Sequence, residues 1–488
     1  MENLLSWLWE NITSVLNGLY LLTVIFIAIL IVLENRSPLK TISWILVLVL
    51  LPFAGIVFYL FFGQEYRKKK MFSRKGLDRL EHLRKMTQNQ LGQIPETTTG
   101  YSEAILSKKH LMSLALNNSN ALLTNNNKLE ILTNGDKAFP SIFKALEEAR
   151  HHIHIEFYIV ENDTIGNQLR EILVRKASEG VEVRFIYDDV GSWALPKKYI
   201  NSLREAGVQI DCFMKVRFPH LTSQANYRNH RKIVVVDGQT AFVGGLNIAD
   251  RYLYGIKNLG IWRDTHLMLK GGAATMLQVV FMADWYFVSK EILHGPEYFP
   301  PLKEGSGKLV QIATSGPDSD WESISQIYFS SIASARERVY LATPYLIPTP
   351  EILNALKVAA MGGVDVRILL PQESDAITPK WSTRSFVSEL LEARVKIYFY
   401  QPGFLHSKTV VVDGVFSSVG TANMDFRSLE TNFEVNALIY NEEIAREMEL
   451  QFMEDLKQSR QIIAGEWEQR PRIEKAKESF ARLLSPML

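Results

Sequence analysis

Two long apolar segments without charged residues lie near the N-terminus, at residues 12–33 and 41–62. Each contains 22 residues, and about 20 helical residues are enough to cross the ~30 Å hydrocarbon core of a bilayer. Pro52 lies inside the second segment, where a membrane helix tolerates proline better than a soluble helix does. The pattern therefore predicts a two-helix transmembrane hairpin within residues 1–66.

Basic residues are concentrated directly after the second apolar segment, whereas the chain before that point carries only Arg36 and Lys40. Positive residues favour the cytoplasmic side of a membrane. We therefore expect a multi-pass protein of the cell membrane in which this cluster, and everything after it, is cytoplasmic. A cleaved signal peptide is disfavoured, because the first eleven residues contain no Lys or Arg and a second apolar segment follows. The cluster, which should also contact anionic membrane lipid, comprises Arg67, Lys68, Lys69, Lys70, Arg74 and Lys75.

Residues 67–128 are basic and polar, with an Asn-rich stretch at 117–127, and we expect a linker with some helix there. Compact sequence should begin near Leu129. Hydrophobic residues make up 47% of the 488 residues, which excludes a disordered chain. The net charge of +1 argues against a nucleic-acid-binding protein. Since Cys212 is the one cysteine, an internal disulfide framework and a thiolate zinc site are excluded.

After the linker, one pattern of strand, helix and strand occurs twice. A further short strand follows each copy, at residues 208–213 and 395–400. Strand, helix and parallel strand form a βαβ unit. The repetition predicts an α/β fold of two pseudo-symmetric lobes, at residues 129–300 and 301–488, with mixed or parallel sheets flanked by helices and additional helices at the C-terminus. The repeated elements are expected at 152–159, 168–178 and 180–186, and at 338–345, 351–361 and 363–369.

Each copy also carries the pattern His-x-Lys-x4-Asp-x6-Gly-x2-Asn. A single His-x-Lys-x4-Asp match is a weak signal. Two matches with the same downstream Gly and Asn, inside a repeated frame, do not arise by chance. The residues are His230, Lys232, Asp237 and Asn247 in the first copy, and His406, Lys408, Asp413 and Asn423 in the second.

The spacing of the motif indicates phosphate chemistry. Alternate residues of a strand share a face, so the His and Lys of each motif point the same way. If the lobes pack pseudo-symmetrically, two imidazoles and two ammonium groups converge. The cations can neutralise phosphate oxygens, while one His attacks phosphorus and the other protonates the leaving oxygen. Asn247 and Asn423 can add neutral donors, and Asp237 and Asp413 are expected to hold a turn or a lysine.

This paired motif resembles the phospholipase D superfamily, which is named for its two HKD motifs. From Leu129 to the end the chain resembles the bacterial cardiolipin synthases in particular, and the N-terminal hairpin resembles theirs too. The matching segments are residues 34–38, 51–55, 315–318, 342–345, 363–367 and 482–486.

The resemblance implies two phospholipase D-like lobes and a reversible phosphatidyl transfer. One phosphatidylglycerol would donate a phosphatidyl group to another, giving cardiolipin and glycerol, with no metal and no cofactor. His230 would form a phosphatidyl-histidine and His406 would act as acid and base, while both lysines and both asparagines would hold the phosphoryl oxygens. The motifs themselves, being related by symmetry, do not decide which histidine attacks.

Members of the superfamily place an acidic residue on a strand after each motif, where it orients the histidine. Glu434 occupies this place in the second lobe and Asp264 in the first. His151, His152 and His154 lack acidic or cysteine partners at useful spacing, so no metal site is predicted there. The alternatives are a hydrolytic phospholipase D, a phosphatidyltransferase using another phospholipid donor, an HKD nuclease and a non-catalytic membrane scaffold. The oligomeric state and the acyl-chain preference stay open.

Overall fold

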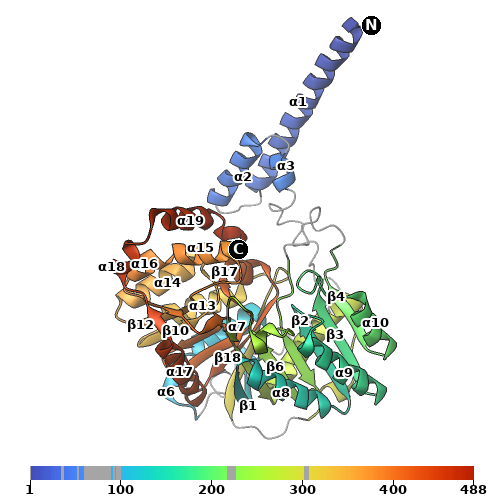
Figure 1. Cartoon of the computed structure of the whole chain (residues 1–488), viewed down its shortest axis with the longest axis vertical. Helices are drawn as coiled ribbons and strands as arrows, with labels where there is room; N and C mark the ends of the chain where they lie inside the picture. Colours follow the sequence, from blue (N-terminus) through green and yellow to red (C-terminus); the bar gives the residue numbers. More distant parts are fainter. Residues whose placement is uncertain are drawn as a thin grey trace. The chain divides into compact units, whose positions relative to one another are not determined.

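The computed structural model describes residues 2–33, 38–51, 54–59, 90–91, 94, 100–216, 227–301 and 307–488 (Figure 1). The chain divides into two compact units. The first comprises residues 1–73 with 216–225, and the second comprises residues 74–215 with 226–488.

The N-terminal unit contains α1 (Glu2–Leu33), α2 (Pro38–Leu50) and α3 (Ala54–Phe58). Within α1, Ser14–Leu33 is long and apolar enough to cross a membrane. The helices α1 and α2 are in contact, since the Tyr20 hydroxyl donates to the Leu48 carbonyl at 2.8 Å. Ile27 and Ile31 of α1 pack against Leu48 in one apolar cluster.

Only one helix of the described residues, α1, reaches the length of a membrane span. The predicted second span, 41–62, is divided between α2 and α3, and Pro52, Phe53 and residues 60–62 lie outside the described residues. The apolar N-terminal helix is therefore established, whereas a hairpin of two spanning helices is not.

The second unit is built on a mixed sheet of fifteen strands within the described residues (Figure 1). Its first half contains, in spatial order, β1 (Thr124–Thr133), β8 (Thr265–Lys270), β6 (Thr240–Gly244), β5 (Ile233–Val236), β2 (His152–Phe157), β3 (Glu182–Asp188) and β4 (Gln209–Phe213). Its second half contains β9 (Lys308–Ser315), β18 (Glu434–Tyr440), β16 (Phe416–Gly420), β15 (Thr409–Val412), β10 (Arg338–Ala342), β12 (Asp365–Pro371), β13 (Lys396–Tyr400) and β19 (Ser459–Gln461).

Apart from β19, the two halves correspond strand for strand, and they meet where β1 pairs antiparallel with β9. The strands β2, β3 and β4 are parallel, as are β10, β12 and β13. The predicted βαβ units are therefore confirmed. The two lobes, however, share one continuous sheet.

Helices cover both faces of this sheet. In the first half they are α8 (Asn134–Glu147), α9 (Thr164–Ser178), α10 (Lys197–Glu205), α11 (Arg251–Tyr254), α12 (Gly272–Ser289) and η3 (Pro296–Tyr298). In the second half they are α13 (Ser323–Ala333), α14 (Pro350–Met361), α15 (Ile377–Ser385), α16 (Val387–Glu392), η4 (Arg427–Thr431), α17 (Glu442–Lys457), α18 (Ala464–Glu468), α19 (Arg472–Leu483) and η5 (Ser485–Met487).

The run of apolar residues in β5 packs on both faces of the sheet. Val235 belongs to an apolar cluster with Leu277 of α12, and Val234 to a cluster with Leu169 of α9. Successive side chains of a strand point to opposite faces, so a strand covered on both sides is apolar throughout. Both valine runs that precede the motif aspartates owe their composition to this burial.

The structure differs from the sequence analysis at residues 100–128, which were expected to form a polar linker. They contain α6 (Glu103–Leu106), α7 (Lys109–Ser119) and the start of β1. Leu111, Met112 and Leu116 of α7 are buried in the apolar core of the second half. Some helix was expected here, but its place in the core was not: Leu111, Met112, Ala115 and Leu116 lie at helical spacing on one buried face and anchor α7 there.

Candidate active site

Both motif histidines lie where a segment of one half pairs with a segment of the other. Asn229, which precedes His230, forms a parallel bridge with Phe433, which precedes Glu434. In the same way, Leu405 of β14 (Gly403–Leu405) pairs with Arg263 of β7 (Ile261–Arg263). Backbone bonds fix both crossings: His230 N donates to Phe433 O at 2.9 Å and His406 N donates to Arg263 O at 2.8 Å.

These crossings bring each histidine to the carboxylate of the other half. His230 Nδ1 lies 3.0 Å from both carboxylate oxygens of Glu434, and His406 Nδ1 lies 2.6 Å from Asp264 Oδ2. The family resemblance associates each carboxylate with the motif that precedes it, whereas the structure pairs it with the histidine of the other motif. A carboxylate at Nδ1 fixes the proton there, so the Nε2 lone pair of each imidazole is available for a substrate.

Each motif lysine is held beside its histidine by the same bond. Lys232 Nζ donates to His230 O at 2.7 Å, and Lys408 Nζ donates to His406 O at 2.5 Å. Lys232 Nζ also lies 5.4 Å from the ring centroid of Tyr158. Both lysines are buried, so the two motifs present equivalent ammonium groups in a site largely closed to water.

The four cationic and basic side chains influence one another across the boundary between the halves. Burial lowers the pKa of His230 to about 4, and the ammonium groups of Lys232 and Lys408 contribute to this decrease. Burial likewise lowers the pKa of Lys232 to about 7 and that of Lys408 to about 8. The pKa of His406 is lowered by burial and by both lysines. A phosphate group bound among these four side chains would raise their pKa values again, because an anion favours the charged forms of histidine and lysine.

The pKa values of the two carboxylates are shifted in opposite directions. Burial raises the pKa of Asp264 to about 6, although Lys408 opposes the increase. Burial also acts to raise the pKa of Glu434, but His230 and Lys232 outweigh it and hold that pKa below its usual value. The Thr421 hydroxyl donates to Glu434 at 2.6 Å. Glu434 is therefore the more firmly ionised partner.

Asp237 and Asp413 follow the other end of β5 and β15, five residues and about 16 Å of extended chain from the motif lysines. Asp237 accepts backbone bonds from Arg150, His151 and His152, where the chain enters β2. Asp413 accepts equivalent bonds from 336–338 and an ion pair from Lys108 at 2.8 Å. These contacts place both aspartates in turns that hold the strands, which is the structural role expected of them from the sequence.

The two motif asparagines are buried close to the histidine segments. Asn247 Oδ1 accepts from Ile159 N at 3.1 Å, and its amide donates to the Tyr252 hydroxyl at 2.5 Å. Tyr252 in turn packs edge-on against His406, with ring centroids 5.4 Å apart. Asn423 Oδ1 has no hydrogen-bond partner among the described residues, and since an amide oxygen can only accept, contact with phosphoryl oxygens would fall to the amide N–H groups.

Two buried Arg–Asp pairs that were not expected from the sequence support the orienting carboxylates. Arg231 pairs with Asp284 of α12, and its Nε donates to the Glu434 carbonyl at 3.3 Å. Arg263 pairs with Asp455 of α17 at 2.9 Å, and it donates to the Asp264 carbonyl. Both arginines are adjacent in sequence to site residues, but Asp284 lies 53 residues from Arg231 and Asp455 lies 192 residues from Arg263, so no local sequence pattern indicates either pair.

No group of three or more His, Cys, Asp and Glu side chains in the described part of the chain is arranged to hold a metal ion. His152 and His154 instead share Gln278, through bonds of 3.1 and 3.0 Å. Burial lowers the pKa of His152 to about 4. These histidines are neutral core residues.

Comparisons with known proteins agree with this geometry. A family model described as "Cardiolipin synthase, PLD-like domain" matches residues 142–285 and 328–456, and one described as "Phospholipase D-nuclease N-terminal" matches residues 20–64. A cardiolipin synthase of Geobacillus sp. is 45% identical over 487 residues, which cover 98% of this chain and 95% of that protein. One of Alkalihalophilus pseudofirmus is 43% identical, with 99% and 95% covered.

Among solved structures, the fold is similar to that of phosphatidylserine synthase from Haemophilus influenzae. The TM-score is 0.61 at 14% identity, and the alignment covers 78% of this chain and 99% of that one. A likeness at this identity concerns the fold alone, and it agrees with two phospholipase D-like halves. The sequence relatives carry the assignment further: the chain belongs to the cardiolipin synthase family of phospholipase D-like enzymes.

Proposed function

We propose that the chain is a cardiolipin synthase, which transfers a phosphatidyl group from one phosphatidylglycerol to another and releases glycerol. The relatives that carry this name match the chain over nearly its whole length. The observation that carries the mechanism is the crossed pairing of His230 with Glu434 and of His406 with Asp264, with one lysine beside each histidine.

In the first step, His230 Nε2 attacks the phosphorus of one phosphatidylglycerol. The bond between phosphorus and the glycerol oxygen breaks, and His406 supplies the proton that glycerol carries away. Because the pKa of His406 is low in the empty site, its protonation must accompany binding of the phosphate anion, which favours the imidazolium.

In the second step, His406 accepts the proton of a glycerol hydroxyl on a second phosphatidylglycerol. That oxygen attacks phosphorus, the P–N bond to His230 breaks, and cardiolipin forms. One phosphodiester is exchanged for another, so the reaction is reversible and uses no nucleotide. Lys232, Lys408 and the two motif asparagines would hold the phosphoryl oxygens, where charge develops in both steps.

Both imidazoles are neutral in the empty site, because burial and the lysines lower both pKa values, so the partner carboxylates are what favours His230 as the nucleophile. Its partner Glu434 is firmly ionised and can stabilise the positive charge that the ring acquires in the adduct. Asp264, with a pKa near 6, is better suited to a histidine that repeatedly gains and loses a proton.

For the rest of the chain, we propose a membrane hairpin in residues 1–66 with the catalytic unit in the cytoplasm of a bacterial cell. The apolar helix at Ser14–Leu33 supports the first span, and the apolar residues at 41–62 support the second. The first lobe then extends from about 129 to 300 and the second from 301 to 488, with α7 added to the second.

Product analysis tests the proposed reaction. Purified full-length protein in detergent and lipid micelles is supplied with phosphatidylglycerol labelled in its phosphate and in its terminal glycerol. Equal amounts of labelled cardiolipin and free glycerol are expected. Phosphatidic acid without cardiolipin would instead identify a hydrolytic phospholipase D. Replacing the donor with phosphatidylethanolamine in a parallel reaction defines the donor range.

Trapping the covalent intermediate tests which histidine is the nucleophile and which acts as acid and base. His406→Ala should form an acid-labile, base-stable phosphatidyl-enzyme slowly, because glycerol leaves poorly without a proton. His230→Ala should form none. The exposed His294 offers a control, and His294→Ala should behave as the unmodified chain does. An adduct in His230→Ala that is absent in His406→Ala would reverse the roles.

A further inference from the structure

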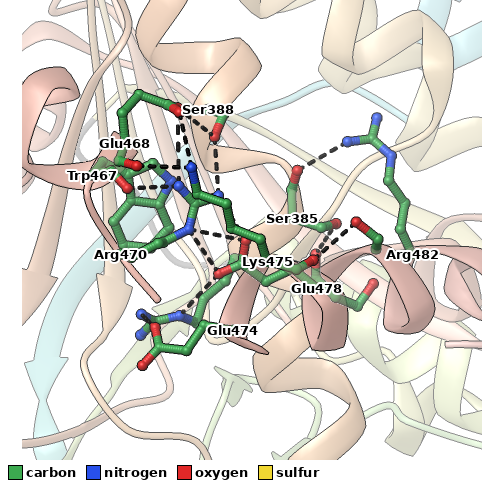
Figure 2. A network of polar contacts seen from close by, with 12 residues as sticks. Ser385, Ser388, Trp467, Glu468, Arg470, Glu474, Lys475, Glu478 and Arg482 are labelled. Carbon is green, nitrogen blue, oxygen red and sulfur yellow. Dashed lines mark hydrogen bonds and ion pairs between the residues drawn. The ribbon is translucent and has the colours of Figure 1, made fainter. Parts of the chain in front are cut away.

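The C-terminal helix α19 binds the rest of the protein through its polar side chains. Glu478, whose side chain is 3% exposed, accepts from Arg470 at 2.7 Å. Arg384 of α15 pairs with Glu478 at 3.6 Å and donates to Glu474 at 3.2 Å. Figure 2 shows Arg470, Glu474 and Glu478 within this network of contacts. Both acidic residues of α19 are therefore neutralised on its inner side.

Further polar contacts fix both ends of the helix. Near its start, Lys475 Nζ donates to the Glu468 carbonyl at 2.7 Å. Near its end, Arg482 donates to the Ser385 carbonyl at 2.9 Å (Figure 2). The hydroxyls of Ser485 and Ser382 are bonded at 2.8 Å. The helix is thus held in place without burying an extended apolar stripe.

The large apolar side chains of α19 face away from the protein. Ile473, Phe480 and Leu483 are 64%, 67% and 76% exposed, and Met487 of η5 is 55% exposed. Within α19, residues 473 and 480 are seven positions apart and residue 483 lies three positions after 480, so these three share one face; Met487 follows in η5. A surface helix of a soluble protein normally directs such a face to the core. The reversed arrangement indicates that another apolar phase or surface covers it.

Basic side chains and an aromatic ring flank this apolar face, and they indicate what kind of partner it binds. Lys477 is exposed on α19, and its Nζ lies 5.0 Å from the ring centroid of Trp381 of α15. Lys380 lies over the same ring at 5.7 Å, and its Nζ also pairs with Glu373 at 2.5 Å, so among the described residues Lys477 supplies the uncompensated positive charge beside the ring. Ile377, which begins α15, is 79% exposed. Apolar side chains flanked by basic groups and an interfacial aromatic ring are typical of a helix that lies in the headgroup region of an anionic bilayer.

This face adjoins the second half of the active site. Asp375, just before α15, accepts from the Tyr345 hydroxyl at 2.6 Å. Burial lowers the pKa of Lys408, and the charge of Asp375 opposes that decrease, so it lies within electrostatic reach of the site. The backbone of Arg427, in the segment after the second motif, donates to the carbonyl of Leu488 at 2.9 Å.

We propose that these residues form a C-terminal docking surface, which rests on the headgroup region of an anionic bilayer and brings the active site to its lipids. The surface consists of Ile473, Phe480, Leu483 and Met487 with Ile377, flanked by Lys380 and Lys477. Binding at this surface is separate from anchoring by the N-terminal apolar helix, and it does not depend on the reaction proposed above.

Depth-dependent fluorescence quenching tests the proposal in the full-length chain. An environment-sensitive fluorophore is attached to Phe480→Cys in a Cys212→Ser background, and the protein is placed in nanodiscs containing phosphatidylglycerol. A matched control carries the fluorophore at Leu450→Cys on α17, where the native side chain is 60% exposed. Because an interfacial helix inserts about 5–10 Å, spin labels high on the lipid acyl chain should quench residue 480 several-fold more than residue 450.

Equal quenching at the two positions would overturn the proposal. So would the absence of quenching together with concentration-dependent crosslinking at residue 480, which would make the surface a contact between copies of the chain. Neither measurement requires an active enzyme, so this test remains valid if the proposed transfer reaction is not observed.

A functional comparison separates docking from structural damage. For the double variant Phe480→Ser and Leu483→Ser, we expect a several-fold higher apparent KM for phosphatidylglycerol in bilayers, with unchanged kcat. Activity on a short-chain phosphatidylglycerol dissolved as monomers should stay unchanged. Leu450→Ser should alter neither. An equal loss on bilayer and monomeric substrates would contradict a docking role.

Discussion

The Glu434 carboxylate lies 3.0 Å from His230 Nδ1, although 204 residues separate the two positions. Asp264 and His406 form the reciprocal pair, 142 residues apart. Each motif histidine is thus paired with a carboxylate of the other half of the molecule. Neither half alone contains both members of either pair.

Glu434→Gln should lower the transfer rate by about 10²–10⁴-fold, because the neutral amide no longer stabilises the positive charge on His230. The reduced step should be formation of the phosphatidyl-enzyme, measured by trapping with labelled phosphatidylglycerol. Asp264→Asn should instead slow resolution of the adduct as well as its formation. The exposed Glu466 provides the control Glu466→Gln. Normal adduct formation in Glu434→Gln would contradict the crossed assignment.

The pH dependence of kcat/KM should follow the unoccupied site. His230, with a pKa of about 4, is neutral and reactive above that pH. Lys232, with a pKa of about 7, loses its charge as the pH rises through that value, so kcat/KM should fall on the alkaline side. Bound phosphate raises the pKa of the lysine, and the fall in kcat should therefore begin at higher pH.

Lys232→Arg offers a check on this interpretation, since an arginine stays charged. Its alkaline decrease in kcat/KM should move toward the pKa of Lys408, about 8. If kcat/KM falls at the same alkaline pH in the variant and in the unmodified chain, a group other than Lys232 controls the decrease.

Asp455→Ala should destabilise the catalytic unit by about 3–5 kcal/mol, because it leaves the buried Arg263 without its partner. The neighbouring Glu454, whose side chain is 60% exposed, serves as the control. Glu454→Ala should have little effect. Denaturant unfolding followed by tryptophan fluorescence measures both. The double variant Arg263→Met and Asp455→Leu should recover much of the lost stability, and equal destabilisation by both single variants would count against this role.

Metal removal should leave turnover largely intact, because the buried ammonium groups of Lys232 and Lys408 supply the positive charge at the phosphoryl group. The measurement is transfer activity after treatment with EDTA and desalting. A control with monovalent salt at matched ionic strength separates a specific requirement from screening of anionic lipid. A loss that only a divalent ion restores would contradict the mechanism.

The orientation of the N-terminal unit can be tested with reporter fusions placed after Lys75. The basic residues at 67–70 predict that this point is cytoplasmic. A periplasmic phosphatase reporter should therefore be inactive there, and a fluorescent protein that folds in the cytoplasm should be bright. A fusion after Arg36 should give the opposite result if both apolar segments span the membrane. An active phosphatase after Lys75 would reverse the assignment.

Much of this protein is determined by sequence features that act locally. The apolar run in α1, the βαβ units and the two HKD motifs follow from periodicity and spacing, and the structure or the comparisons confirm the features that they test. The family assignment also rests on the motifs, since two copies in one repeated frame leave little ambiguity. The predicted roles of the motif residues stay predictions until the adduct experiments are done.

Tertiary packing decided the remaining features, because they depend on contacts between distant positions. The bridge between Asn229 and Phe433 brings Glu434 to His230, and no local pattern specifies that crossing. Burial of Leu111 and Leu116 in the second half turned an apparent linker into part of the core. The outward face of α19 likewise followed from the ion pairs of Glu478. An amphipathic sequence defines two faces of a helix, but only its partners determine which face is turned toward the protein.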